Sequence, residues 1–123
     1  MRERSVCAVA VVCLAGSAAP AFAGEHGTIL FESDRAGGEQ TDVWTMSVHG
    51  RHLVNLTAGS PVQDGNASWR PDGRRIAFAT FRDATLGGGE FNAEIYTMRA
   101  DGSKPANLTQ SPAFDILPDW RPS

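Results

Sequence analysis

Short apolar runs bounded by turn residues predict β-strands along most of this chain. Ile76–Ala79 follows the turn pair Asp72-Gly73, and the β-branched and aromatic run Ile95–Met98 is closed by Asp101-Gly102. Two shorter segments, Ala67–Trp69 and Asn107–Thr109, predict a very short strand and a weak one. No stretch beyond the N-terminal region shows a sustained 3.6-residue period, which disfavours a helical fold. The pattern predicts an all-β fold.

The strand pattern occurs twice, with a period near 50 residues. The aligned segments are Ile29–Arg35 with Ile76–Arg82 at an offset of 47, Val43–Met46 with Ile95–Met98 and Asn55–Thr57 with Asn107–Thr109 at 52, and Trp69–Pro71 with Trp120–Pro122 at 51. Gly87-Gly88-Gly89 marks a longer loop that accounts for the jump in offset. Four short antiparallel strands recurring at this period are typical of a β-propeller blade.

The run Trp69–Phe78, followed by Ile95–Met98, Ala100–Ser103 and Leu108-Thr109, resembles the repeat of TolB-type, WD40-like β-propellers. The resemblance implies two four-stranded antiparallel blades of a partial propeller, with repeats at about 27–73 and 74–123. The first copy is looser, and the α/β domain of TolB proteins has no counterpart in this sequence. The residues expected to hold the repeat together are Trp69, Pro71, Asp72, Gly73, Asp101, Gly102, Trp120 and Pro122.

The N-terminal region predicts an export signal. A basic start at Arg2 and Arg4 precedes the apolar run Val6–Leu14, and small residues before Ala23 suit cleavage there. We expect a helical signal peptide over 1–23, a periplasmic or secreted product and no membrane anchor, since the apolar run is too short to span a bilayer of about 30 Å. Both cysteines, Cys7 and Cys13, lie inside this segment, so the exported part would have no disulfide.

Charge and motifs narrow the possible functions. The net charge is −3, and acidic and basic residues are interspersed along the sequence. This argues against a nucleic-acid partner, because proteins bind nucleic acid through a patch of basic residues. The sequence has no Gly-x-Ser-x-Gly, no His-Glu-x-x-His and no phosphate-binding glycine loop, so we predict no enzyme activity and no cofactor. His49 and His52 bracket a turn without a third ligand nearby in sequence, and we predict no metal site.

The loop from Arg82 to Glu94 is not repeated and is the candidate binding surface, because loops on a rigid scaffold often carry function. Its candidate residues are Arg82, Asp83, Glu90, Phe91 and Asn92. A tolerated insertion is the alternative. Trp69 and Trp120 could stack on a sugar or peptide, but we expect them to anchor the inner strand. The sequons at Asn55, Asn66 and Asn107 are expected to carry no glycan, since two of them are part of the repeat.

The order of the repeats adds a further expectation. We call the strand nearest the central axis of a propeller the inner strand. If the Trp-containing strand is the inner strand, the chain lacks it in its first blade and carries an extra one at Trp120. Two blades cannot close a ring of four to eight. Head-to-tail assembly, with Trp120 of one chain completing the first blade of the next, would let three chains make six blades. The alternative is a remnant of a longer propeller.

For function, the sequence predicts a non-catalytic exported module that binds a protein or glycan of the cell envelope. The alternatives are an accessory part of a prolyl-oligopeptidase-type serine peptidase, since similar propellers gate such enzymes, and a non-functional remnant.

Overall fold

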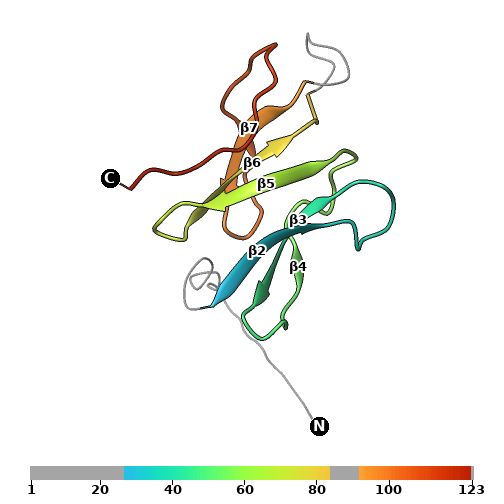
Figure 1. The fold of residues 1–123 in the computed structure, drawn as a ribbon, viewed down its shortest axis with the longest axis vertical. Coiled ribbons are helices and arrows are strands. Elements are labelled where there is room, and N and C mark those ends of the chain that lie inside the picture. The colour runs from blue at the N-terminus through green and yellow to red at the C-terminus, as the bar shows by residue number, and fades with distance from the viewer. Residues whose placement is uncertain (1–26, 84–91, 123) are drawn as a thin grey trace.

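The computed structural model describes residues 27–83 and 92–122, which form two antiparallel β-sheets (Figure 1). The first sheet has the strands β2 (Thr28–Ser33), β3 (Asp42–Ser47) and β4 (Val54–Asn55), in that order. The second sheet has the strands β5 (Asp64–Trp69), β6 (Arg75–Thr80), β7 (Glu94–Arg99) and β8 (Ala106–Asn107), also in chain order. This part of the chain contains no helix long and apolar enough to cross a membrane.

The all-β prediction is confirmed, but the prediction of two four-stranded blades is correct only for the second sheet. In the described residues the first sheet has three strands. The strand predicted at Trp120 is also wrong, because residues 108–122 form no strand. The strand that ends at Trp69 is longer than expected and spans six residues. The predicted signal peptide lies outside the described residues.

The two sheets repeat the same pairing. In the first, Phe31 of β2 lies opposite Trp44 of β3; in the second, Phe78 of β6 lies opposite Tyr96 of β7. These pairs occupy equivalent positions of the sequence repeat. Aromatic residues facing one another across antiparallel strands stabilise a sheet. The repeat in the sequence therefore corresponds to a repeat in strand register.

An Asn-Leu-Thr sequence closes the outer edge of each sheet. In the first, the Thr57 hydroxyl accepts a hydrogen bond from the Val43 backbone N–H at 3.0 Å and donates to the Asp42 carboxylate at 3.3 Å. The Asn55 amide donates to the same carboxylate at 2.8 Å, and its carbonyl oxygen accepts from the Thr57 backbone N–H at 3.0 Å. The motif thus ties the short strand β4 to the start of β3.

Residues 107–109 close the second sheet in the same way, with Glu94 and Asp83 as the carboxylate acceptors. We call the arrangement in each sheet the Asn-Leu-Thr clamp. The Thr109 hydroxyl accepts from the Ile95 backbone N–H at 3.0 Å and donates to Glu94, while the side-chain oxygen Oδ1 of Asn107 accepts from the Thr109 backbone N–H at 3.0 Å. The Asn107 amide donates to Asp83 at 2.8 Å. Polar groups that would be costly to bury unpaired are in this way satisfied inside each sheet.

The hydrophobic core lies between the two sheets. Val43 and Leu56 come from the first sheet and its outer edge, and Ile76, Phe78, Tyr96 and Met98 come from the second. Leu30, Ala67 and Trp69 pack against this cluster from its margin. Neither sheet could bury its apolar face alone, because each needs the other to exclude water. The paired sheets therefore form one packed unit.

Two equivalent turns differ in what surrounds them. Gly50 and Gly102 both adopt positive φ, at 78° and 87°, and both donate a backbone hydrogen bond across a tight turn. A Cβ atom added at Gly50 would meet nothing within 4 Å, whereas one at Gly102 would lie 2.6 Å from the Leu56 carbonyl oxygen. The second turn therefore packs directly on the first sheet.

This difference predicts unequal effects of the same substitution. Gly50→Ala should lower the free energy of unfolding by about 1 kcal/mol, the cost of a left-handed backbone for a residue with a Cβ. Gly102→Ala should lower it by about 2 kcal/mol or more, because the Leu56 carbonyl must also move. Urea unfolding of both variants measures the difference, and equal losses would contradict the packing of this turn on the first sheet.

Candidate functional site

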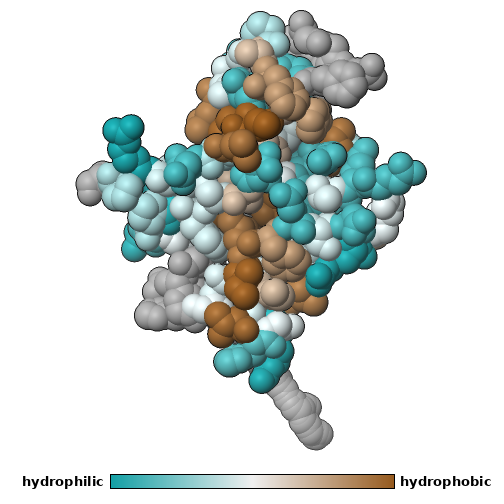
Figure 2. Space-filling model, in the orientation of Figure 1, coloured by the Kyte–Doolittle hydropathy of each residue, from teal (hydrophilic) through white to brown (hydrophobic). Residues whose placement is uncertain are grey.

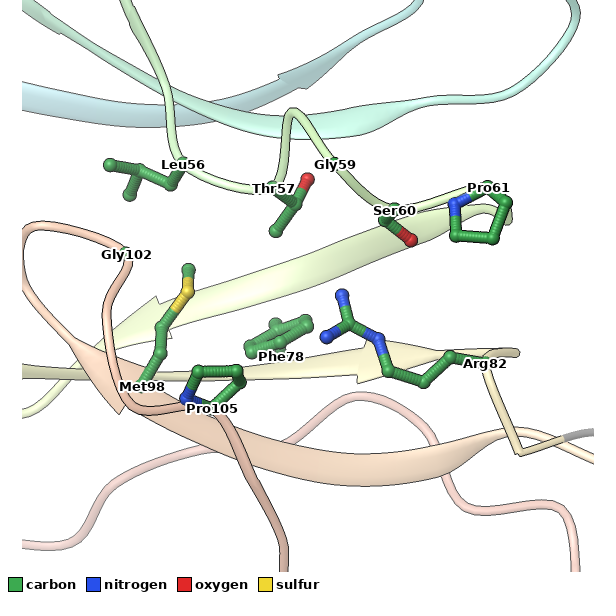
Figure 3. A pocket seen from close by; sticks show the side chains of 10 residues that line it. All are labelled: Leu56, Thr57, Gly59, Ser60, Pro61, Phe78, Arg82, Met98, Gly102 and Pro105. Carbon is green, nitrogen blue, oxygen red and sulfur yellow. The ribbon is translucent and has the colours of Figure 1, made fainter.

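A cavity of about 270 Å³ opens between the two sheets (Figure 3). The first sheet's outer edge and the segment after it supply one wall, and β6, β7 and the turn at Gly102 supply the other. The residues that line the cavity are Leu56, Thr57, Gly59, Ser60, Pro61, Phe78, Arg82, Met98, Gly102 and Pro105. Figure 3 shows the Arg82 guanidinium extending into this space beside the Phe78 ring. We call this cavity the inter-sheet cleft.

Arg82 is held in the cleft by several groups of the second sheet. Its Nε donates to the Thr80 hydroxyl at 3.0 Å, and a terminal nitrogen lies 3.2 and 3.3 Å from the two carboxylate oxygens of Asp64. The guanidinium carbon also lies 5.5 Å from the centre of the Phe78 ring and 5.1 Å from that of Tyr96. The ion pair and the aromatic faces together fix the guanidinium in one orientation.

Asp64 is fully buried at the start of β5. Its backbone N–H donates to the Thr41 carbonyl at 2.9 Å, and its own carbonyl accepts from the Thr41 hydroxyl at 2.9 Å. These contacts join β5 to the segment before β3 in the other sheet. A buried carboxylate needs a partner charge, and Arg82 provides it.

A second hollow, of about 470 Å³, lies at the end of the second sheet where β7 begins and is lined mainly by polar residues. Its lining residues are Asp83, Glu94, Asn107, Gln110, Ser111 and Pro112. The Tyr96 hydroxyl donates to the Asp83 carboxylate. Burial of the phenol and this hydrogen bond together raise the pKa of Tyr96 to about 12, so the hydroxyl remains a donor at neutral pH.

Glu94 is buried within the clamp of the second sheet. Burial opposes ionisation of its carboxyl group, but hydrogen bonds from the Thr109 hydroxyl, the Ser111 backbone N–H and the Asn92 amide outweigh that effect. The pKa of Glu94 therefore lies below its ordinary value. The ionised carboxylate acts as an acceptor that holds the start of β7 to the segment after β8.

The candidate loop residues are separated in the structure. Arg82 extends into the inter-sheet cleft, Asp83 lines the second hollow, and Asn92 is buried with its amide on Glu94 and on the Ser111 carbonyl. Glu90 and Phe91 lie outside the described residues. A single binding surface made of all five residues stays a prediction, whereas the three described ones all make contacts within the fold.

The residues of the repeat motif occupy turns and packing positions. Gly73 has φ of 72° and donates to the Arg70 carbonyl at 2.8 Å, with Pro71 and Asp72 at the centre of the turn. The Asp72 carboxylate accepts from the Arg74 backbone N–H at 2.9 Å and pairs with the Arg70 guanidinium. The hydrogen bond from this guanidinium is the main cause that lowers the pKa of Asp72 to about 2.

The equivalent turn at Asp101-Gly102 has a similar arrangement. The Asp101 carboxylate accepts from the Ser103 hydroxyl and backbone N–H, which lower its pKa. At the end of the described chain, Trp120 donates its indole N–H to the Ser68 carbonyl at 3.0 Å, and Pro122 follows it. Residues 27–83 and 92–122 contain no cluster of three or more metal-ligating side chains.

The sequence interpretation did not single out Asp64 or the wall of the cleft formed by Thr57, Ser60 and Pro61. A signal for Asp64 was present: it lies five residues before Trp69, and Asp115 lies five residues before Trp120. Extending the aligned Trp-Arg-Pro segments toward the N-terminus would have found this acid. The cleft wall carries no comparable pattern, because it arises from the packing of one sheet on the other.

Because Arg82 pairs with Asp64, we predict that replacing Arg82 destabilises the protein much more than replacing Arg35, which occupies the equivalent position. Arg82→Ala should lower the free energy of unfolding by about 2–4 kcal/mol, because it leaves the buried Asp64 carboxylate unpaired. Arg35→Ala, at the equivalent position of the first sheet, should lower it by about 0.5–1 kcal/mol, the value of its aromatic contacts. Urea unfolding at neutral pH and low protein concentration tests this; similar losses would contradict it.

The lowered pKa of Glu94 predicts a pH dependence of stability. A carboxyl whose folded pKa is depressed stabilises the fold above its unfolded pKa of about 4.3, and this contribution disappears as the pH falls through the folded value. Unfolding free energies of the parent and of Glu94→Gln should therefore differ most above about pH 5 and converge as the pH falls further. Denaturant titrations across this range measure the gap, and a constant gap would refute the assignment.

Comparisons with known proteins agree with this architecture. The chain is 40% identical over 101 residues to a Tol-Pal system protein TolB from Anaeromyxobacter dehalogenans (strain 2CP-C), and this match covers 82% of the chain and 21% of that protein. A solved structure described as TolB from Agrobacterium tumefaciens superposes with a TM-score of 0.53 and 22% identity, covering 65% of this chain and 28% of that one. No protein-family model matches the sequence.

The chain thus spans about a fifth of the length of its curated relative and shares the fold of a TolB structure. The sequence match includes most of the described residues. The resemblance suggested by the Trp-Arg-Pro-Asp-Gly repeat is confirmed: this chain is similar to TolB in sequence, and its fold is propeller-like.

Proposed function

We propose that this chain is a non-catalytic, exported β-propeller module that binds a protein of the cell envelope through its inter-sheet cleft. The observation that carries the proposal is the cleft itself, which combines an apolar lining with one fixed guanidinium. The relative from Anaeromyxobacter dehalogenans is named as part of the Tol-Pal system, which supports an envelope protein as partner. The export signal predicted over 1–23 supports a periplasmic location.

The lining of the cleft favours a peptide segment over a glycan. Pro61 and Pro105 offer exposed apolar surface beside the buried Leu56 and Met98, and Arg82 provides the charged group among the lining residues. Apolar pockets with a few fixed polar groups suit an apolar side chain with an acceptor beside it. A sugar would present many hydroxyl groups that such a lining leaves unpaired. An accessory role beside a serine peptidase, or a remnant without a ligand, are the alternatives that the test distinguishes.

Gly59 provides a way to block the cleft. A Cβ atom at this position would meet nothing within 4 Å, and the residue is not among those with positive φ. Gly59→Trp should therefore fill the cleft with little backbone strain. Leu53→Trp is the matched control, because Leu53 is an exposed apolar residue that does not line the cleft.

The test is capture of partners from a cell-envelope extract on the immobilised chain, followed by mass spectrometry. We expect a specific envelope protein to be retained by the parent and by Leu53→Trp, and its recovery to fall about tenfold or more with Gly59→Trp, as expected when a buried anchor loses its pocket. Retention of a hydrolase would favour the accessory role. Retention of glycan alone, or capture unaffected by Gly59→Trp, would contradict the proposal.

A further inference from the structure

The segment from Asp115 to Trp120 repeats the backbone of β5 without being a strand. The Asp115 backbone N–H donates to the Ala93 carbonyl at 2.9 Å, as that of Asp64 donates to the Thr41 carbonyl. Leu117 has φ of 59°, and Asn66, the equivalent residue in the irregular part of β5, has φ of 50°. The segment is thus shaped as an inner strand, although it pairs with none of the described strands.

Contacts beside β5 hold this segment in place. The Trp120 indole donates to the Ser68 carbonyl at 3.0 Å, and the Ser68 hydroxyl donates to the Pro118 carbonyl at 3.1 Å. Figure 1 shows the C-terminal stretch crossing beside the second sheet. The large apolar side chains Phe114, Ile116 and Leu117 remain exposed. We call residues 115–120 the tail segment.

Among the described strands, none takes the place beside β2 that β5 takes beside β6 in the second sheet. Ile29 of β2 is 37% exposed, whereas Ile76, its equivalent in β6, is fully buried. In the second sheet β5 pairs with β6, but within residues 27–83 and 92–122 the strand that pairs with β2 is β3. Figure 2 shows apolar side chains in a band that runs down the face containing β2 and the C-terminal stretch.

Arg35 has the same kinds of hydroxyl and aromatic neighbours as Arg82, but among the described residues no carboxylate forms an ion pair with it. Its Nε donates to the Ser33 hydroxyl at 3.0 Å, and its guanidinium carbon lies 4.9 Å from the Phe31 ring centre and 5.5 Å from that of Trp44. These are the positions that Thr80, Phe78 and Tyr96 occupy around Arg82. Ion pairs within the described part of the chain join Arg70 to Asp72 and Arg82 to Asp64, and none includes Arg35.

We propose that two copies of this chain associate head to tail, with the tail segment of one copy adding to β2 of the next as its missing fourth strand. Asp115 then pairs with Arg35 of the other copy, as Asp64 pairs with Arg82. The register of β5 on β6 places Asp115 opposite Ser33 and Trp120 opposite Ile29 in an antiparallel ladder. Strand addition of this kind satisfies exposed edge groups and buries the apolar side chains beside them.

A second copy fits this edge better than an unrelated strand for two reasons. The charge at Asp115 complements the charge at Arg35, and the backbone of the tail segment already has the irregularity that β5 shows on β6. The tail segment and the β2 edge belong to different repeats, so each copy would offer both halves of the contact. The proposal is independent of the cleft and of the proposed function.

The test is sedimentation of the purified full chain with charge reversals at the two positions. As the protein concentration is raised through the micromolar range, the average mass of the parent in sedimentation should rise above that of the monomer. Arg35→Asp and Asp115→Arg should each weaken association about 30-fold or more, the lower range for breaking a buried, hydrogen-bonded charge pair. An equimolar mixture of the two variants should recover association, since one retains the native arginine and the other the native aspartate.

Glu39→Arg is the matched control for Asp115→Arg, because it makes the same charge change at an exposed residue between β2 and β3. It should associate as the parent does, and thermal unfolding monitored by circular dichroism should show that every variant is folded. A parent that stays monomeric, single variants that associate as the parent does, or a mixture that stays monomeric would each overturn the proposal. Those results would mean that other residues of the chain, or another protein, cover β2.

Discussion

The ion pair between Arg82 and the buried Asp64 is the interaction on which the second sheet and the cleft both depend. It joins the first residue of β5 to the segment after β6, and its guanidinium lies against the rings of Phe78 and Tyr96. Removing Arg82 would leave the Asp64 carboxylate charged and unpaired in a place from which water is excluded. The pair therefore fixes the inner strand to the middle of the sheet and also determines the polar group that the cleft presents.

The same chemistry recurs in an incomplete form in the first sheet. Arg35 has the aromatic faces and the hydroxyl acceptor but no carboxylate among the described residues, and Ile29 beside it is partly exposed. The Asn-Leu-Thr clamps, by contrast, are complete in both sheets. The outer edge of each repeat is thus satisfied locally, while the inner edge depends on a strand from a neighbouring repeat. This dependence is expected of a repeat architecture, in which each unit buries its faces against the next.

The packing of the sheets also explains why the Pro-Asp-Gly turn of the strongest sequence motif does not line the cleft. Pro71, Asp72 and Gly73 fix a turn, and the acids of both turns are occupied by nearby backbone and side-chain donors. The cleft instead lies between Leu56 of the first sheet and Met98 of the second, which are far apart in the sequence. In this chain the turn residues Pro71, Asp72 and Gly73 stabilise the repeat, while Phe78 and Gly102, which also belong to the repeat motif, line the proposed binding surface.

The sequence by itself determined the all-β class, the repeat period and the turns, because strand and turn preferences act over a few residues. It also determined that Arg35 and Arg82, or Asp64 and Asp115, occupy equivalent positions. Only the tertiary structure decided that Asp64 pairs with Arg82 while Asp115 has no ion-pair partner among the described residues, that Trp120 lies outside any strand, and that Arg82 extends into a cleft. Those outcomes depend on which strands lie next to one another, and a local pattern carries no information about a neighbour in another repeat.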